Sequence, residues 1–381
     1  MNKPIYLSLA HMSGAEQTFI EEAFRTNWVA PLGPNVNGFE ADLENYLSAE
    51  ARVCALSAGT AALHLGLIQL DVHPGDEVIC QSFTFSASAN PICYQGATPV
   101  FVDSETDTWN LDPVRLEEAI KDRIAQTGRK PKAIIPVHLY GMPARMQEIC
   151  DIANRYEIPI LEDAAEALGS TYHGKPCGTF GHFGALSFNG NKIITTSGGG
   201  ALVCNNAEEK KHTLFLATQA RDEAPHYQHS NVGYNYRMSN ICAGIGRGQM
   251  TVIDEHLAAR RRNNALYRKA LANVPGISFQ SEPDDSYRSN FWLTTILVDP
   301  EKTGGVTRDV LRLALEAENI ESRPLWKPLH LQPIFADAPR YGGEVCEKMF
   351  NQGLCLPSGP MVSESDLHRI CELLLSYLPH E

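Results

Sequence analysis

Short strand-like and helix-like segments alternate along this chain from residue 53 to about residue 220. The strand-like segments are apolar on both faces, which is typical of strands buried in a parallel sheet. Alternation of this kind, with short connections, predicts an α/β fold in which helices cover both faces of a mostly parallel central sheet. The expected strands are 53–56, 77–80, 99–102, 133–139 and 158–161, and the expected helices are 59–70, 116–124 and 144–156.

The pattern changes after about residue 250, where a long helical segment rich in Arg and Ala ends at Pro275-Gly276. We therefore expect two domains. Residues 1–250 would form an N-terminal arm of about 30 residues and a large domain, and residues 251–381 a smaller α+β domain. The further elements expected are helices at 37–47, 251–274, 309–318 and 363–377 and a strand at 291–298.

Composition excludes several classes of protein. The 381 residues include 45 acids against 32 Lys and Arg, a net charge of −13, so the chain lacks the basic footprint of a nucleic-acid binder. None of the ten cysteines forms a C-x-x-C pair, which favours free thiols in a reducing cytosol. Neither a signal peptide nor an apolar run near the ~18 residues of a membrane span is evident. We expect a cytoplasmic protein without nucleic-acid or membrane partners.

Familiar nucleotide and hydrolase motifs are also missing. The chain has no G-x-G-x-x-G or G-x-x-x-x-G-K-[ST] segment, which argues against NAD and ATP as cofactors, and no G-x-S-x-G. His226 and His229 have a spacing compatible with metal ligands, but no cysteine or acid completes a set, so we expect no metal.

The segment 187–200, Ser-Phe-Asn-Gly-Asn-Lys-Ile-Ile-Thr-Thr-Ser-Gly-Gly-Gly, places a lone lysine in a polar loop between two strand-like stretches. Most lysines are simply solvated. Lys192, however, has apolar neighbours in Phe188 and Ile193, and a lysine held in a buried loop can act as a nucleophile and base. Ser187, five residues earlier, could donate to a phosphate.

Two further sites complete a pattern that suits pyridoxal phosphate, which needs an amine, phosphate donors and an acid for its ring nitrogen. Asp163 follows a buried strand, where it could pair with a pyridinium nitrogen or only cap a short helix. The segment 57–61 joins a strand to a helix, whose N-terminus could bind phosphate or merely be capped by Ser57 or Thr60. An aromatic ring in the run Phe83-Thr-Phe85 could stack on a flat cofactor or pack in the core.

Taken together, these residues resemble the DegT-type sugar aminotransferases, which are pyridoxal phosphate enzymes of the aspartate-aminotransferase fold (fold type I). The resemblance runs nearly from end to end. The segments that carry it are 57–64, 83–90, 137–141, 162–166, 187–200 and 233–239.

The resemblance implies how the cofactor would be held. Lys192 matches the lysine that forms a Schiff base with pyridoxal phosphate, and it speaks against the dehydratase branch, which has histidine there. Asp163 matches the acid at the ring nitrogen, and Phe85 falls where an aromatic residue covers the ring. The residues at the phosphate site would be Gly59, Thr60 and Ser187.

The resemblance also implies partners. Asn235 matches an asparagine that reaches the phosphate from the neighbouring subunit, which implies a homodimer with shared active sites. Arg237 and His330 fall where relatives contact the diphosphate of a nucleotide sugar. Glu166 replaces the Gln or His of many relatives, and its carboxyl could bond the cofactor 3-hydroxyl or a sugar group.

Segments 27–34, 187–192 and 224–229 are most similar to enzymes that transfer an amino group from L-glutamate to C4 of UDP-4-keto-6-deoxy-N-acetylglucosamine. The product would be a precursor of bacillosamine-type sugars for polysaccharide biosynthesis or protein glycosylation. Two alternatives remain: amination of another keto sugar nucleotide, such as GDP-4-keto-6-deoxymannose or a dTDP-keto sugar, and a pyridoxal phosphate-binding regulator without turnover.

Overall fold

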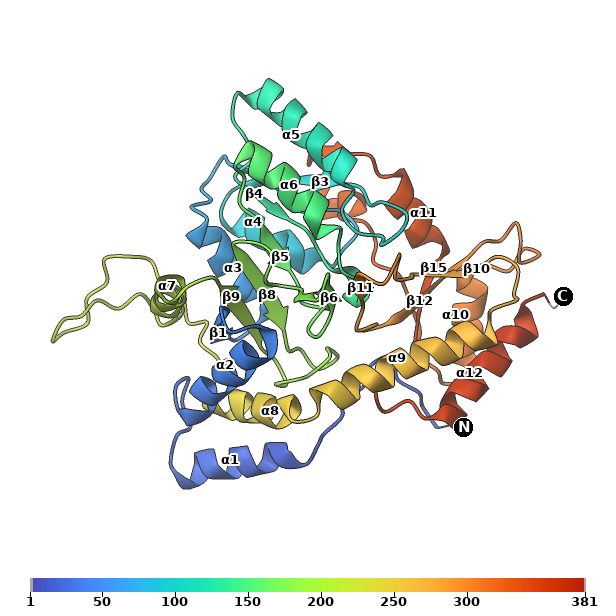
Figure 1. The fold of residues 1–381 in the computed structure, drawn as a ribbon, viewed down its shortest axis with the longest axis horizontal. Helices are drawn as coiled ribbons and strands as arrows, with labels where there is room; N and C mark the ends of the chain where they lie inside the picture. Colours follow the sequence, from blue (N-terminus) through green and yellow to red (C-terminus); the bar gives the residue numbers. More distant parts are fainter. Residues whose placement is uncertain (1–2, 380–381) are drawn as a thin grey trace.

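A mixed β-sheet forms the centre of the computed structural model, which describes residues 3–379 (Figure 1). Two four-stranded sheets, β14-β3-β2-β4 and β5-β8-β9-β1, adjoin where Ile134 pairs with Ile160 and Val137 with Asp163. All neighbouring strands are parallel except at β9, which is antiparallel to both β8 and β1. The expected parallel sheet is thus confirmed. Its strands are β1 (Arg52–Leu56), β2 (Glu77–Gln81), β3 (Thr98–Val102), β4 (Ala133–Ile135), β5 (Leu161–Asp163), β8 (Phe183–Ser187), β9 (Gly200–Cys204) and β14 (Arg340–Tyr341).

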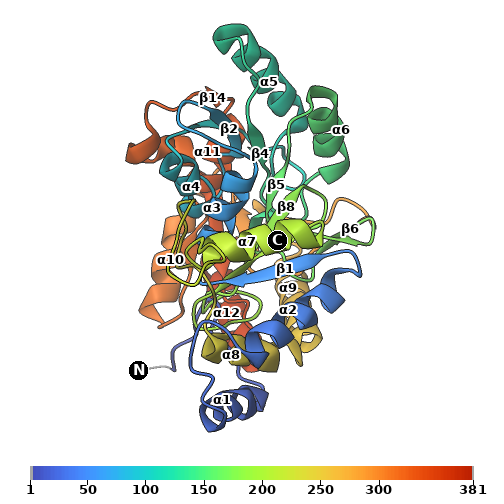
Figure 2. The ribbon, with the colours of Figure 1, turned by 90° about the vertical axis from the view of Figure 1, so that its left-hand side faces the viewer.

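Helices cover both faces of this sheet (Figure 2). Successive strand residues point to opposite sides, so Val53 packs in the same core as α2 whereas Cys54 packs with α3. Likewise Ile79 packs with α5 and α6, and Cys80 packs on the opposite face. These helices and their neighbours are α2 (Pro34–Leu47), α3 (Gly59–Gln69), α4 (Asn90–Tyr94), α5 (Pro113–Thr127), α6 (Met146–Tyr156) and α7 (Ala207–Ala217).

The C-terminal part contains a second sheet, of order β10-β12-β15-β13, in which every pairing is antiparallel. We propose a domain boundary near residue 250, where α8 gives way to α9, although β14 from beyond it joins the central sheet. The elements are α8 (Asn240–Met250), α9 (Ile253–Ala270), β10 (Ile277–Phe279), β12 (Thr294–Val298), α10 (Arg308–Ala317), β13 (Arg323–Pro324), α11 (Glu344–Gln352), β15 (Gly353–Leu356) and α12 (Glu364–Tyr377); β11 (Tyr287–Arg288) pairs with β6 (Thr171–Tyr172), which pairs with β7 (Lys175–Pro176).

Among residues 3–379, five α-helices go beyond the sequence expectations, namely α1 (Ala15–Arg25), α4, α7, α8 and α11, and two of them pack together. Helix α1 lies in the N-terminal arm and packs along α8 (Figure 1). Helix α8 carries three glycines, which normally disfavour a helix. A Cβ at Gly246 would lie 2.7 Å from the ring of Phe39, and one at Gly248 would lie 2.5 Å from the backbone of Glu16. Glycine is therefore needed where α1 and α2 press against α8.

The strand expected from residue 291 begins at Thr294 instead. Phe291 has a left-handed φ of 45°, and the Oδ1 atom of Asn290 accepts a hydrogen bond from the backbone N–H of Trp292 (2.8 Å). This turn delays the strand by three residues and directs the chain past the loop that carries Lys192.

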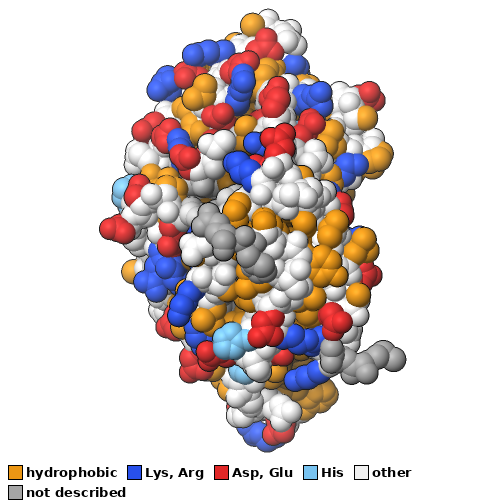
Figure 3. Space-filling view, turned by 90° about the vertical axis from the view of Figure 1, so that its right-hand side faces the viewer, with side chains coloured by type: hydrophobic (Ala, Val, Ile, Leu, Met, Phe, Trp, Pro, Cys, Tyr) orange, Lys and Arg blue, Asp and Glu red, His pale blue; other side chains and the backbone are white. Residues whose placement is uncertain are grey.

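The surface carries charges of both signs. Figure 3 shows one face, on which Lys, Arg, Asp and Glu side chains are interspersed with apolar ones. Among residues 3–379, no helix has the length and apolarity to cross a membrane. All ten cysteines lie in this range and are free thiols.

Candidate active site

A cavity of about 430 Å³ lies beyond the carboxyl ends of β5 and β8, next to the first turn of α3. This is where open α/β sheets bind their ligands. Seven of the residues singled out in the sequence line it together: Gly59, Thr60, Phe85, Asp163, Glu166, Ser187 and Lys192.

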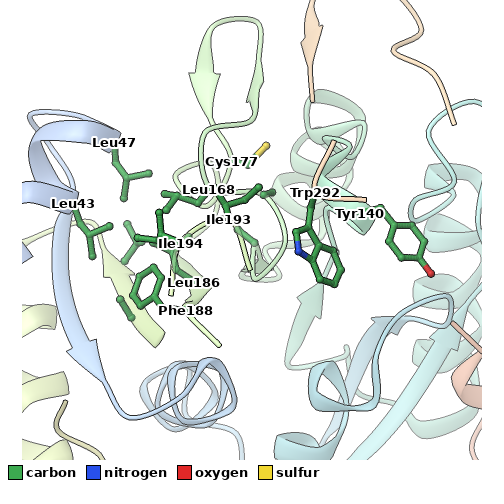
Figure 4. Packing of buried hydrophobic residues seen from close by; sticks show 14 of the residues in the cluster. Leu43, Leu47, Tyr140, Leu168, Cys177, Leu186, Phe188, Ile193, Ile194 and Trp292 are labelled. Atoms are coloured by element: carbon green, nitrogen blue, oxygen red, sulfur yellow. The ribbon is translucent and has the colours of Figure 1, made fainter. Parts of the chain in front are cut away.

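Lys192 enters the cavity from the loop between β8 and β9, and its side chain is 14% exposed. Its Nζ atom lies 3.9 Å from the ring centre of Trp292 and 3.6 Å from Oε1 of Glu166. The flanking apolar residues anchor the loop, since Phe188 and Ile194 pack against Leu43 of α2 (Figure 4). The amine is thus presented to the cavity from a well-packed loop.

Glu166 is buried behind this amine. Its Oε2 atom accepts a hydrogen bond from the backbone N–H of Tyr140 (2.6 Å), and Oε1 accepts one from Nε1 of Trp326 (3.3 Å). Burial raises the pKa of the Glu166 carboxyl, while the nearby Lys192 amine lowers it. The two N–H donors thus hold the Glu166 carboxyl in place beside the Lys192 amine.

Asp163 ends β5 and is 5% exposed. Its Oδ2 atom accepts a hydrogen bond from Oγ of Ser88 (2.6 Å), and Oδ1 accepts one from the backbone N–H of Ala165 (3.1 Å). The hydrogen bond from Ala165 is a local one within a turn. Asp163 therefore also has part of the local capping role that the sequence left open as an alternative. The carboxylate nevertheless lines the cavity that Lys192 enters, where it can pair with a protonated ring nitrogen.

The first turn of α3 is open to the cavity. The N-cap residue is Ala58, and no side chain accepts a hydrogen bond from the first N–H groups of the helix. Neither Ser57 nor Thr60 therefore caps α3. Unpaired N–H groups at a helix N-terminus are a natural site for phosphate. A Cβ at Gly59 would lie 3.0 Å from Cβ of Ser187, so glycine keeps this cradle open.

The two phenylalanines of the 83–90 segment have different environments. Phe83 is fully buried in the core, whereas Phe85 is 53% exposed and lines the cavity. The ring centre of Phe85 lies 5.2 Å from that of Trp326. Phe85 is therefore the aromatic residue available to stack on a flat ligand.

Asn235 and Arg237 line a second cavity, of about 1050 Å³, together with residues 28–37 near the start of α2. Asn235 is exposed, and its Oδ1 atom accepts a hydrogen bond from Nε2 of Gln219 (3.2 Å). Arg237 is paired with Glu40 and donates to the carbonyl oxygen of Ala55 (3.0 Å). Neither residue lines the cavity of Lys192.

His330 is buried among polar partners. Its Nδ1 atom is hydrogen-bonded to Oγ of Ser82 (2.7 Å), and its Nε2 atom donates to Oε1 of Glu347 (3.0 Å). It does not line either cavity described above. Within residues 3–379, no three His, Cys, Asp or Glu side chains are grouped as metal ligands.

Sequence reasoning missed three cavity residues. Ser88 lies inside the 83–90 segment and Trp326 lies close before His330, so both stood next to residues already singled out. Trp292 offered no local signal, because it reaches Lys192 only through the tertiary fold.

The sequence model of the DegT/DnrJ/EryC1/StrS aminotransferase family matches residues 11–375, and the chain belongs to this family. EpsN of Bacillus subtilis (strain 168), named as a pyridoxal phosphate-dependent aminotransferase, is 52% identical over 98% of this chain and 96% of its own. A GDP-perosamine synthase of Caulobacter vibrioides is 37% identical over 97% of both chains. The crystal structure of a family member from Brucella abortus superposes with a TM-score of 0.89, at 32% identity and 96% coverage of both chains.

The protein is thus a pyridoxal phosphate-dependent aminotransferase of fold type I. The cavity fits this cofactor, because it combines an amine, a buried carboxylate, an exposed aromatic ring and an uncapped helix N-terminus. When bound, pyridoxal phosphate stabilises negative charge at the carbon next to the amino group.

Proposed function

We propose that the protein transfers the amino group of L-glutamate to C4 of UDP-4-keto-6-deoxy-N-acetylglucosamine in the cytoplasm, for glycan biosynthesis of the bacillosamine type. The observation that carries the chemistry is the entry of Lys192 into a cavity that also holds Asp163 and the open N-terminus of α3. The resemblance of segments 27–34, 187–192 and 224–229 supports this substrate.

In this proposal, each residue has a distinct task. Lys192 attaches the cofactor, removes the Cα proton of L-glutamate, and supplies a proton to C4 of the keto sugar in the second half-reaction. Asp163 keeps the ring nitrogen protonated, and Ser88 orients the carboxylate. Gly59, Thr60 and Ser187 bind the phosphate, Phe85 covers the ring, and Glu166 contacts the cofactor or a sugar hydroxyl.

The decisive test is the variant Lys192→Ala, which should bind pyridoxal phosphate but show no turnover, because the base for both half-reactions is lost. Production of amino sugar would be followed by mass spectrometry. Substantial residual turnover would contradict the role of Lys192. A variant of an exposed lysine, Lys269→Ala on α9, should keep wild-type activity and serves as the control.

A second substrate deserves equal testing, because a GDP-perosamine synthase is 37% identical to the chain. GDP-4-keto-6-deoxymannose and a dTDP-keto sugar should be compared with the UDP sugar at matched concentrations. A higher kcat/KM with the GDP sugar would retain the aminotransferase and overturn the UDP assignment. Bound cofactor without product from any of the three sugars would favour a regulator without turnover.

We also propose a homodimer whose active sites are shared between subunits. Asn235 and Arg237 lie in a cavity separate from Lys192, although the resemblance implies roles for them at the cofactor phosphate and the nucleotide diphosphate. A second copy that brings its Asn235 to the cavity of Lys192 would reconcile these two observations.

A further inference from the structure

The loop that carries Lys192 is held by hydrogen bonds to its backbone. The carbonyl oxygen of Asn191 accepts one from Oγ of Ser8 in the N-terminal arm and another from Nε1 of Trp292, each at 2.7 Å. These two donors lie far apart in the sequence. The residue before Lys192 is therefore fixed from two sides, and neither contact involves the amine itself.

Helix α9 holds the next two carbonyl groups. His256 and Arg260 are one helical turn apart, so their side chains lie on the same face. Nδ1 of His256 donates to the carbonyl oxygen of Ile193 (3.1 Å), and Arg260 donates to that of Lys192 (3.4 Å). Three consecutive carbonyl groups thus bind side chains from outside the loop.

Arg260 connects these contacts. Its guanidinium group also donates to the carbonyl oxygen of Trp292 (2.6 Å) and to Oγ of Ser8 (3.1 Å). One side chain therefore links the backbone of Lys192, the residue whose ring lies under the Lys192 amine, and the serine that binds Asn191. Removing it would loosen all three contacts at once.

The burial of the charged Arg260 side chain costs free energy, because the guanidinium group loses its contact with water. The residue is 1% exposed, it forms no ion pair with a carboxylate among residues 3–379, and its Nε atom has no hydrogen-bond partner. Three titratable side chains line the same small cavity as Arg260: His256 on its own helix, Lys192 on the loop, and His11 of the arm, whose Nδ1 atom lies 3.1 Å from Nε2 of His256. Burial lowers the pKa of Arg260 to about 9, so it stays charged at neutral pH.

A buried cation without a carboxylate is a poor way to gain stability, because its desolvation is uncompensated. The partners of Arg260 are instead two carbonyl groups and a hydroxyl around the lysine loop. We propose that Arg260 is a positioning residue, which holds the backbone of Lys192 and Trp292 together so that the amine stays over the indole ring and beside Glu166. This inference rests on the role given to Lys192 under "Proposed function".

The test compares wild type with Arg260→Met, Arg260→Lys and the control Arg262→Met, an exposed arginine of the same helix. Each protein is incubated with pyridoxal phosphate and reduced with borohydride, and peptide mass mapping gives the fraction of cofactor attached at position 192. Steady-state kinetics give kcat and KM separately, and thermal melting gives the folded fraction.

We expect Arg260→Met to lower both the attachment at position 192 and kcat, the latter by about 100-fold, as for a displacement of about 1 Å at a catalytic group. KM for the keto sugar should change little. Arg260→Lys keeps the charge but not the planar fork of donors, so it should be intermediate. If the methionine variant fails to fold, the lysine variant carries the test.

Unchanged attachment and kcat per folded molecule in both Arg260 variants would overturn the inference, even if the melting temperature fell, since the role would then be only structural. An equal loss in Arg262→Met would overturn it as well. Failure of the wild-type protein to attach the cofactor at Lys192 is a different result, because it would refute the proposed function itself.

Discussion

Glu166 and Lys192 oppose each other across 3.6 Å in a site largely closed to water. Burial disfavours the charged form of the Glu166 carboxyl more strongly than the nearby Lys192 amine favours it, so the pKa of this carboxyl is raised. The protonation of this buried acid therefore sets the charge beside the Lys192 amine.

The raised pKa of Glu166 predicts a pH dependence of stability. A carboxyl whose pKa is higher in the folded state than in the unfolded chain contributes fully at low pH, and this contribution is lost as pH rises through the folded-state pKa. The test compares the free energy of unfolding of the wild type with that of Glu166→Gln. The wild-type value minus the variant value should fall as the pH rises above 4.5, the ordinary pKa of a glutamate carboxyl. Urea unfolding of the cofactor-free proteins across a pH series measures it, and a difference that rises with pH would refute it.

A second prediction concerns Asp163. Asp163→Asn can still accept the hydrogen bond from Ser88 but removes the charge that keeps a ring nitrogen protonated. We expect kcat to fall by about 100-fold, because a ring nitrogen that loses its proton stabilises negative charge less well, with a smaller change in KM. The control is Asp151→Asn, an exposed position on α6. Equal kcat values for Asp163→Asn and wild type would remove Asp163 from the chemistry.

At the scale of elements, the site depends on how closely β9 approaches the first turn of α3. A Cβ at Gly200 would lie 2.3 Å from the backbone nitrogen of Gly59 and 2.4 Å from the carbonyl carbon of Ala58. No side chain fits there without moving the helix. The strand thus sets the position of the N–H groups that we assign to the phosphate.

Gly200→Ala should therefore destabilise the cofactor-free protein by about 1–3 kcal/mol, the range for overpacking, and weaken its affinity for pyridoxal phosphate. Gly198→Ala is the matched control for stability, because a Cβ there meets no atom within 4 Å. Urea unfolding and cofactor titration measure the two effects. If both variants were equally stable, the close approach of β9 would not constrain α3.

The elements that the sequence predicts best are those whose signal is local. Helix α3 has a continuous apolar run, so Gly59 could be placed at its start. Asp163 could be placed just after a buried strand, although β5 shares only Leu161 with the expected strand 158–161. Helix α8 could not be predicted, because its three glycines disfavour a helix until α1 and α2 pack on it. Nor could Arg260 be linked to Lys192, since 68 residues separate them.

At the scale of the whole molecule, four residues with inferred roles in one reaction lie in two separate cavities. Lys192 and Asp163 line one, and Asn235 and Arg237 line the other. Exposed apolar side chains surround the second cavity, including Trp28, Leu32 and Tyr227. A subunit contact over this region would bury them and would place Asn235 near another copy of the chain, as we propose.

Shared sites predict that two inactive variants restore each other. Lys192→Ala and Asn235→Ala should each have little activity alone. In a mixed dimer, one site contains both substitutions and the other contains neither, so random assortment of equal amounts should yield about a quarter of wild-type activity. The mixture is dissociated in mild denaturant, reassembled and assayed, and each variant treated alone is the control. If each site were built from one chain, no wild-type site could form and the mixture would stay as inactive as its components.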